Sequence, residues 1–443
     1  MCNLPALANV LQGSFEAAAN RANKHSRAIK RVRKFTPITL AQTFVIALMS
    51  KPNAGPGHIA DTAAVLGVNV STQAVVQRGG PELKSFFRSL FSEMIKLVVQ
   101  SETPMATILS RFTEVRLMDS SVISLPKSQA EEFLGGGVKN GHVISSLKLQ
   151  TELDLKTGQL CGIQIEPGRQ TDQGTDRQHM APKEGSLRIT DLGYFNLKVF
   201  AMIHAASAYF LSRTQHTVSV MVDDQCLNLI QFLCTSTCGR IDQQVVLGTQ
   251  NKLACRLIAW RVPEAIENKR RRKLRETMAD KGRNVTKAAM ESCAWEYLIT
   301  NLSEDQLSFE EAIILYRSRW QIELLFKRWK SYCQIDLLDG PDDEMTMTRM
   351  WIRLCGAVLQ HWISTQIGWP VAMRISLAKL ASLIQKMAWD FASHLRGSAT
   401  DLIAFLSRFE SLAQRRCRRT KRKKNPGTAE LLDNAKLLEY VLS

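Results

Sequence analysis

The spacing of apolar and polar residues changes twice along the chain. Residues 1–112, and the chain beyond residue 335, carry patterns typical of helices, as in ITLAQTFVIALMS and RMWIRLCGAVLQHWIS. From Thr113 the pattern becomes that of strands: TEVRLMD alternates and ends at Asp119, and SLRITD ends at Asp191. The order strand, hairpin, helix, strand, helix, strand predicts a mixed α/β sheet.

A hairpin and an insertion complete this middle region. VISSLKLQTELDLKTGQLCGIQIEP holds two alternating runs, with a turn at Lys156, Thr157 and Gly158. Further strands are expected in QQVVLGTQ, KLACRLIAWRVPE and CAWEYLIT. We therefore expect a helical N-terminal region over residues 1–112 and an α/β core over 113–345 with a β-rich insertion at about 224–300. A helical C-terminal region with a basic tail would follow over 346–443.

One N-terminal segment, residues 58–78, has the order of a helix-turn-helix. A helix is expected before Gly67, and a second helix would begin after Ser71, which is a good N-cap residue. A plain helical hairpin with a glycine turn explains the segment equally well. In the helix-turn-helix interpretation four side chains would face a DNA groove: Thr72, Gln73, Gln77 and Arg78.

The charge favours a polyanionic partner. The 443 residues carry a formal net charge of +17, and such an excess promotes binding to phosphates through counterion release. Basic runs lie at residues 21–34, 269–275 and 415–424. A basic surface that is simply hydrated is the alternative for each run, so charge alone does not establish DNA binding.

Other bulk features restrict the class of protein. We find no stretch of about 20 uncharged apolar residues and no signal peptide, so we expect no membrane span and a cytoplasmic location. The ten cysteines are scattered, and Cys226, Cys234 and Cys238 lack the paired spacing of zinc sites. We interpret them as reduced thiols.

The segment YRSRWQIELLFKRWK, residues 316–330, carries the most specific pattern. On a helix, Tyr316, Arg319, Glu323 and Lys330 fall within roughly 60° of one another. A carboxylate thus lies in a row with a phenol and two cations. A surface salt bridge between Glu323 and Lys327 is the alternative. The neighbouring sector is apolar and is expected to face the core; it holds Ile322, Leu325, Phe326 and Trp329.

Three carboxylates form the candidate catalytic set. Asp119 and Asp191 end expected strands and Glu323 lies on the helix, so all three could meet where the helix packs across the sheet. Their mutual repulsion would be relieved by divalent metal. Two such ions can activate a water or a 3′-hydroxyl and stabilise the leaving oxygen of a phosphodiester. Taken singly, each aspartate is more often a turn or cap residue.

The same residues resemble a known family. The spacing of Tyr316, Arg319, Glu323 and Lys330 is similar to the signature of DDE transposases of bacterial insertion sequences, the IS-four family, which have a ribonuclease-H-like catalytic core. The segments DSS at 119–121 and DLGYF at 191–195 resemble those of the two catalytic aspartates. LKLQTELDLKTGQL resembles the strand pair between them, and WEYLITNL resembles the last strand of the insertion. The likeness covers roughly residues 35–345.

The resemblance implies roles for individual residues. Asp119, Asp191 and Glu323 would be catalytic and would bind Mg²⁺, or Mn²⁺ in its place. Lys330, Tyr316 and Arg319 would hold phosphates of the transposon end.

Two further DNA contacts are implied with open alternatives. Trp295 would stack on a flipped base, or it is a buried strand aromatic. Arg213 would contact DNA, or it forms a structural ion pair.

The expected function is transposition. The protein would bind the terminal inverted repeats of its element, cut each end and join the freed 3′-hydroxyls to target DNA, as a homodimer assembled on double-stranded DNA. It would be cytoplasmic and associated with the nucleoid. A metal-dependent endonuclease without strand transfer and a DNA-binding repressor that uses residues 58–78 are the alternatives.

Overall fold

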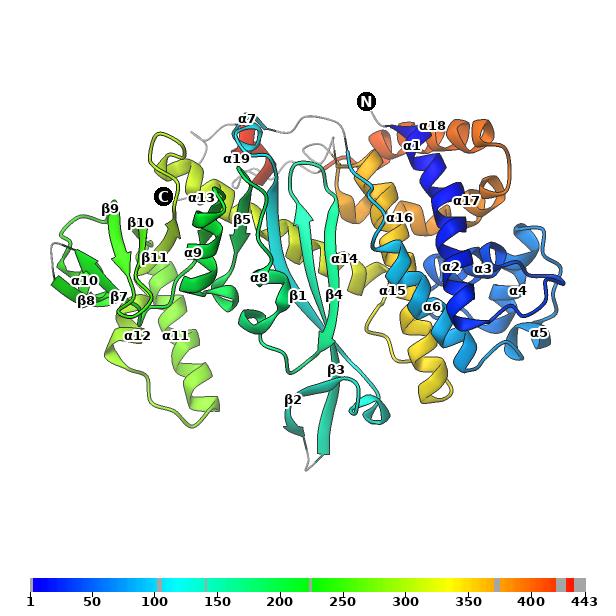
Figure 1. Ribbon diagram of the computed structural model, residues 1–443, viewed down its shortest axis with the longest axis horizontal. Helices are drawn as coiled ribbons and strands as arrows, with labels where there is room; N and C mark the ends of the chain where they lie inside the picture. The colour runs from blue at the N-terminus through cyan, green and yellow to red at the C-terminus, as the bar shows by residue number, and fades with distance from the viewer. Residues whose placement is uncertain are drawn as a thin grey trace. The chain divides into compact units, whose positions relative to one another are not determined.

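The computed structural model describes residues 3–101, 106–139, 142–222, 225–369, 375–419 and 428–433. The chain divides into two compact units that interleave along the sequence. Unit 1 comprises Met1–Met105, Ser120–Gln170 and Gln321–Lys421, and unit 2 comprises Ala106–Asp119, Thr171–Trp320 and Arg422–Ser443. The fold is mixed α/β (Figure 1). Residues 420–424 of the predicted basic tail lie outside the described residues.

Unit 1 is built mostly from helices. Its helices are α1 Leu4–Asn9, α2 Phe15–Ser26, α3 Pro37–Ser50, α4 Pro56–Val65, α5 Thr72–Val76, α6 Pro81–Met94, α15 Asp343–Ile367, α16 Leu377–Lys386, α17 Ala388–Leu395 and α18 Ala399–Arg416. Nearly all of α14, Trp320–Tyr332, also belongs to it. Three strands accompany them: β2 Leu134–Lys139, β3 His142–Asp154 and β4 Leu160–Pro167.

The 25-residue helix α15 organises unit 1. It packs against α3 and α6, and almost every residue from Thr346 to Ile367 is buried. Asp342 caps its first turn by accepting a hydrogen bond from Met345 N at 2.7 Å. Buried Arg353 donates to the Pro52 and Leu337 carbonyls and to Asp339. A helix that is buried on all sides needs such surrounding elements, and its polar side chains need hydrogen-bond partners there.

The predicted hairpin is present as β3 and β4, and its turn is anchored in this helical core. Gly158 has a left-handed φ of +72°, and its carbonyl accepts a hydrogen bond from His361 Nε2 of α15 at 2.8 Å. Thr157 Oγ1 donates to Asp154 Oδ2 at 2.6 Å, which closes the turn. A Cβ at residue 158 would lie 2.6 Å from ring atoms of Trp369.

Unit 2 holds an extended sheet. Its elements are α7 Thr107–Ser110, α8 Asp176–His179, β5 Leu187–Thr190, α9 Leu197–Ala205, β6 Tyr209–Ser212, β7 Ser219–Val222, β8 Gln225–Asn228, α10 Leu229–Thr235, β9 Arg240–Leu247, β10 Leu253–Arg261, α11 Glu264–Asp280, α12 Lys287–Ser292, β11 Trp295–Thr300, α13 Phe309–Ser318 and α19 Thr428–Asp433. Strand β1, Val115–Ser124, begins in this unit.

The strand order in unit 2 is β1-β5-β6-β11-β10-β9-β7-β8 (Figure 1). β1, β5 and β6 are parallel, and the later pairs are antiparallel. Helix α9 follows β5 and packs on β6 and β10. Phe200 of α9 stacks on Phe210 of β6 with ring centroids 4.6 Å apart. This apolar layer holds the parallel strands in place, so the residues at their ends have fixed neighbours.

The helix-turn-helix segment has the predicted order but a short second helix. Gly67 has φ +74°, and Ser71 caps α5 by accepting a hydrogen bond from Ala74 N at 3.2 Å. Helix α5 spans only five residues. The Arg78 guanidinium lies 5.0 Å from the centroid of the Phe35 ring. DNA reading by this segment stays a prediction.

Gly158→Ala should destabilise unit 1. The substitution combines a left-handed backbone with a clash against a buried indole, so we expect a loss of about 2–4 kcal/mol, read as a lower melting temperature. Gly136→Ala is the matched control, because its Cβ would meet nothing within 4 Å and its φ is not left-handed. Equal melting temperatures for the two variants would contradict the packing described for the turn.

The buried imidazole of His361 should make stability depend on pH. Burial lowers the pKa of His361 to about 3, from 6.5 when unfolded. Below pH 6.5 the unfolded chain therefore takes up a proton that the folded chain does not, and stability falls by ~1.4 kcal/mol per pH unit. In denaturant titrations between pH 7 and 4, His361→Gln should lose stability less steeply than wild type. Parallel curves for the two proteins would show that His361 is not the titrating group.

Candidate functional site

The first candidate residues lie on the parallel strands of unit 2 or directly after them. The prediction that a strand ends at Asp119 is wrong, because β1 continues to Ser124. β1 and β5 pair up to Leu117 opposite Ile189, and β5 and β6 pair up to Thr190 opposite Ser212. Neighbouring strands are about 4.8 Å apart. Continued by one or two residues, this register brings Asp119, Asp191 and Arg213 to neighbouring positions.

Asp191 also has a structural role at this edge. Its carboxylate caps the short helical turn Leu192–Tyr194 by accepting a hydrogen bond from Gly193 N at 2.9 Å. A Cβ on Gly193 would lie 3.1 Å from Asp191 Oδ1 and 3.2 Å from Asp172 Oδ2. The glycine therefore lets a second carboxylate, from Asp172, approach the catalytic candidate. Sequence reasoning missed Asp172, whose signal was its place in the polar run GRQTDQGTDRQH.

Arg319 brings a cation to Asp119. Its Nη1 lies 3.5 Å from Asp119 Oδ2, and the two side chains are only 16% and 17% exposed. Arg319 follows α13, where the helical ladder is interrupted: its N–H bonds to the Tyr316 carbonyl three residues back, at 3.1 Å, and α14 begins at Trp320. The predicted continuous helix over residues 316–330 is therefore split at Arg319 by a tighter turn.

Tyr316 is the buried phenol of this cluster. Burial, with a smaller contribution from the charge of Asp191, raises its pKa to about 12 against the opposing charges of Arg319 and Arg213. Arg319 also hydrogen-bonds to the phenol, and its guanidinium lies 5.9 Å from the ring centroid. Tyr316 is thus a neutral hydrogen-bonding group within reach of both charges.

Arg213 forms an ion pair, one of the two roles considered for it. Its Nη2 donates to Glu296 of β11, and the other oxygen of Glu296 accepts a hydrogen bond from Arg270 of α11. Burial works against the charge of Arg213, but Glu296 and Tyr316 outweigh it and raise the pKa of Arg213. The Arg213 side chain is 39% exposed, and DNA contact by this residue stays a prediction.

Trp295 lies inside the hydrophobic cluster of the insertion. Its side chain is only 2% exposed, and the Arg261 guanidinium covers the ring at 5.0 Å from the centroid. This is the buried strand aromatic considered above. Base stacking would require the ring to leave the cluster, and it stays a prediction.

Glu323 and Lys330 belong to unit 1. The predicted core stripe of α14 is buried: Ile322, Leu325, Phe326 and Trp329. Both Glu323 and Lys330 are half-buried, and Lys330 Nζ donates to the Val122 carbonyl of β1 at 3.2 Å. The apolar stripe therefore orients the face that carries these two residues.

The donor set suits a hard cation. Carboxylate oxygens are the ligands that Mg²⁺ and Mn²⁺ prefer, and Asp119 and Asp191 are adjacent and partly shielded from water. Across the described ranges, no group of three or more His, Cys, Asp or Glu side chains is gathered so as to hold a metal ion.

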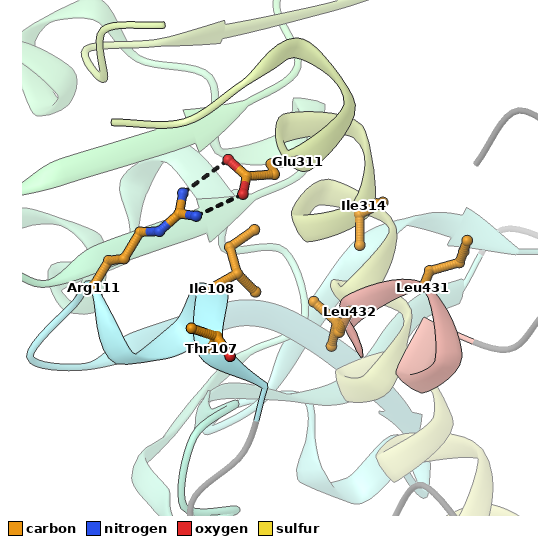
Figure 2. Close-up of a pocket in the computed structure, with 7 residues that line it drawn as sticks. All are labelled: Thr107, Ile108, Arg111, Glu311, Ile314, Leu431 and Leu432. Atoms are coloured by element: carbon orange, nitrogen blue, oxygen red, sulfur yellow. Dashed lines mark hydrogen bonds and ion pairs between the residues drawn. The ribbon is translucent and has the colours of Figure 1, made fainter. Parts of the chain in front are cut away.

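Helix α13, which carries Tyr316, is anchored at its other end. Glu311 completes a capping box with Ser308 and receives both Nη atoms of Arg111, at 2.7 and 2.8 Å. Figure 2 shows this pair beside a cavity of about 160 Å³, which Leu431 and Leu432 of α19 also line. The remaining lining residues are Thr107, Ile108 and Ile314. These contacts make α13 a fixed support for the cluster.

Comparison with known proteins gives a consistent family. Residues 110–359 match the family described as the transposase DDE domain. The chain belongs to the DDE transposases. It is 27% identical over 337 residues to the transposase for insertion sequence element IS231F of Bacillus thuringiensis subsp. israelensis, covering 71% of this chain and 70% of that protein. It is 23% identical over 385 residues to the transposase for IS1151 of Clostridium perfringens, covering 81% and 80%.

Family membership confirms the expected class of enzyme. DDE transposases catalyse DNA cleavage and strand transfer, and their catalytic domain implies a divalent metal. The resemblance drawn from the four-residue signature and the two aspartate segments is therefore confirmed. Within the described part of the chain, no helix of this transposase is long and apolar enough to cross a bilayer.

The burial of Tyr316 can be tested directly. The folded pKa of about 12 lies above the ordinary value of 10. The phenol therefore contributes to the free energy of unfolding below pH 10, and this contribution is lost as the pH rises toward 12. Tyrosinate absorbance should therefore be the same for wild type and Tyr316→Phe up to pH 11. A difference of one tyrosinate between pH 9 and 11 would mean that the phenol is accessible.

Proposed function

We propose that this transposase binds the terminal inverted repeats of its own insertion sequence, hydrolyses the phosphodiester at each end and joins the freed 3′-hydroxyls to target DNA. The observation that carries the proposal is the parallel pairing of β1, β5 and β6, whose register, continued by one or two residues, brings Asp119, Asp191 and Arg213 to neighbouring positions. Acids placed next to a phosphate-binding cation are what phosphodiester chemistry requires.

Asp119, Asp191 and Glu323 are the proposed metal ligands. The two aspartates have adjacent positions in unit 2, and Glu323 follows from the family signature one helical turn after Arg319. Bound Mg²⁺ or Mn²⁺ would supply Lewis acidity and charge neutralisation at the scissile phosphate. Arg319, now paired with Asp119, would turn its guanidinium to the phosphate once Asp119 has another cation to neutralise it.

The remaining signature residues would position the DNA strand. Tyr316, neutral at all working pH values, would donate a hydrogen bond to a phosphate oxygen. Arg319 and Arg213 would give charge-assisted bonds to neighbouring phosphates, and Lys330 would hold the strand from α14. Trp295 would stack on a flipped base if the insertion opens.

The regions on either side of the site extend this proposal. Residues 1–112 would be the helical DNA-binding region, 113–345 the ribonuclease-H-like core with its insertion at about 224–300, and 346–443 a C-terminal region that helps dimerisation. Two transposon ends need two active sites, so a homodimer on DNA is proposed. With its charge of +17, the protein would associate with the nucleoid, and its binding would weaken steeply with salt.

The decisive test is cleavage of a labelled duplex that carries the end of the element. Wild type should nick the end with Mg²⁺, and Glu323→Gln, Asp119→Asn and Asp191→Asn should each bind the duplex but cut at least about 10³-fold more slowly, a loss of ~4 kcal/mol. Glu310→Gln is the matched control, because this exposed glutamate lies on α13 and pairs with Arg240.

Other outcomes have defined meanings. If Glu323→Gln cuts as fast as wild type, the carboxylate is structural and the catalytic assignment is wrong. If wild type nicks the end but pre-cut ends give no joined products, the enzyme is a nuclease on the same core. If every protein binds and none cuts, a DNA-binding repressor is the better account.

A further inference from the structure

One carboxylate in unit 2 holds two arginines that come from different elements. Glu296 on β11 accepts a hydrogen bond from Arg213, at the end of β6, on Oε2, and one from Arg270, in the middle of α11, on Oε1. Arg270 also donates through Nη1 to the Trp295 carbonyl at 3.3 Å. The insertion helix is therefore tied to the strand end at which Asp191 lies.

The charges in this trio do not cancel. Two guanidiniums share one carboxylate, which leaves an excess of one positive charge. Glu296 is the best shielded of the three, with 19% of its side chain exposed, while Arg213 and Arg270 are 39% and 33% exposed. A guanidinium has five N–H donors in a planar fork, and Glu296 takes one from each arginine. The other N–H groups of Arg213 and Arg270 therefore form a donor surface that suits a phosphate.

Neighbouring cations of α11 are placed differently. Arg271 pairs with Glu267 of the same helix at 2.6 Å. Arg272 has a side chain that is 74% exposed and lies 3.8 Å from Glu276. Only a cation that is held by another element has a defined position relative to the strand ends. This separates Arg270 from residues that merely add charge to the helix surface.

We propose that Arg270 is a second phosphate-binding cation beside Arg213, and that Glu296 is the positioning residue that holds both. Arg213 follows Ser212, which pairs with Thr190 just before Asp191, and the charge of Arg213 interacts with Tyr316. A strand whose scissile phosphate reaches Asp191 thus has its next phosphates near this pair. Arg270 comes from the insertion and Arg213 from the core, and together with Glu296 they form the proposed phosphate clamp. This inference rests on the proposed function, because the ligand is the phosphate backbone of the transposon end.

The first experiment compares two variants with the same change of charge. Binding of the labelled end duplex is measured from 50 to 300 mM KCl, without divalent metal, for wild type, Arg270→Ala and Arg272→Ala. Arg270→Ala should bind about tenfold more weakly at 100 mM salt, and its slope of log affinity against log salt should be shallower by about 0.9. Arg272→Ala should change affinity less than twofold. Equal effects of the two variants would overturn the assignment of Arg270.

The second experiment tests Glu296 as a positioning residue. Glu296→Gln removes a negative charge, so binding of the duplex should be at least as tight as in wild type, while the cleavage rate at saturating DNA should fall about tenfold because the two arginines repel and separate. Glu296→Asp should recover part of the rate. If Glu296→Gln cuts at the wild-type rate, or loses binding together with melting temperature, the positioning role is wrong.

These outcomes are separate from failure of the proposed function. If wild type cleaves and Glu323→Gln does not, but the salt slopes of Arg270→Ala and Arg272→Ala agree, the function stands and the clamp fails. If wild type does not cleave, the function fails, while a slope change confined to Arg270→Ala still supports the clamp. Arg270→Lys tests whether the planar guanidinium is needed. Because the charge is kept, the slope of log affinity against log salt should match wild type, while cleavage should be slower.

Discussion

The candidate site depends above all on the register of three parallel strands. The register of β1, β5 and β6, continued by one or two residues, brings Asp119, Asp191 and Arg213 to neighbouring positions. A shift of one residue in any strand would turn the side chain concerned to the opposite face of the sheet. The stacked rings of Phe200 and Phe210 and the apolar layer around them resist such a shift. Hydrophobic packing away from the site thus determines which charges meet within it.

Ion pairs then fix the positions of the charged side chains at the candidate site. Asp119 faces Arg319 and Arg213 faces Glu296, and the charges of Arg319, Arg213 and Asp191 act on the buried phenol of Tyr316. Each partly buried ion pair avoids the cost of an isolated charge. In the proposed function, a metal would replace Arg319 at Asp119, while Arg213 would bind phosphate and keep its bond to Glu296.

Unit 1 shows the same dependence of polar groups on a packed core. His361 and Trp369 anchor the tip of the β3–β4 hairpin by bonding the Gly158 and Leu155 carbonyls. The same unit carries the stripe of α14 that sets the direction of Glu323 and Lys330. The helices at the two ends of the sequence are therefore supports for residues from the central region, whatever else they bind.

The sequence by itself determined the family and many of the local elements, and it named the candidate site residues. The spacing of apolar residues and the turn-forming residues placed the hairpin turn at Gly158, the cap at Ser71 and the core stripe of α14, because these are local properties of the chain. The sequence could not determine the contacts that arise when distant segments pair. The burial of Trp295, the approach of Asp172 to Gly193, the break of the helix at Arg319 and the link from Arg270 through Glu296 to Arg213 were decided by tertiary structure. Each depends on strand order and register, which bring together residues up to about 80 positions apart in the chain.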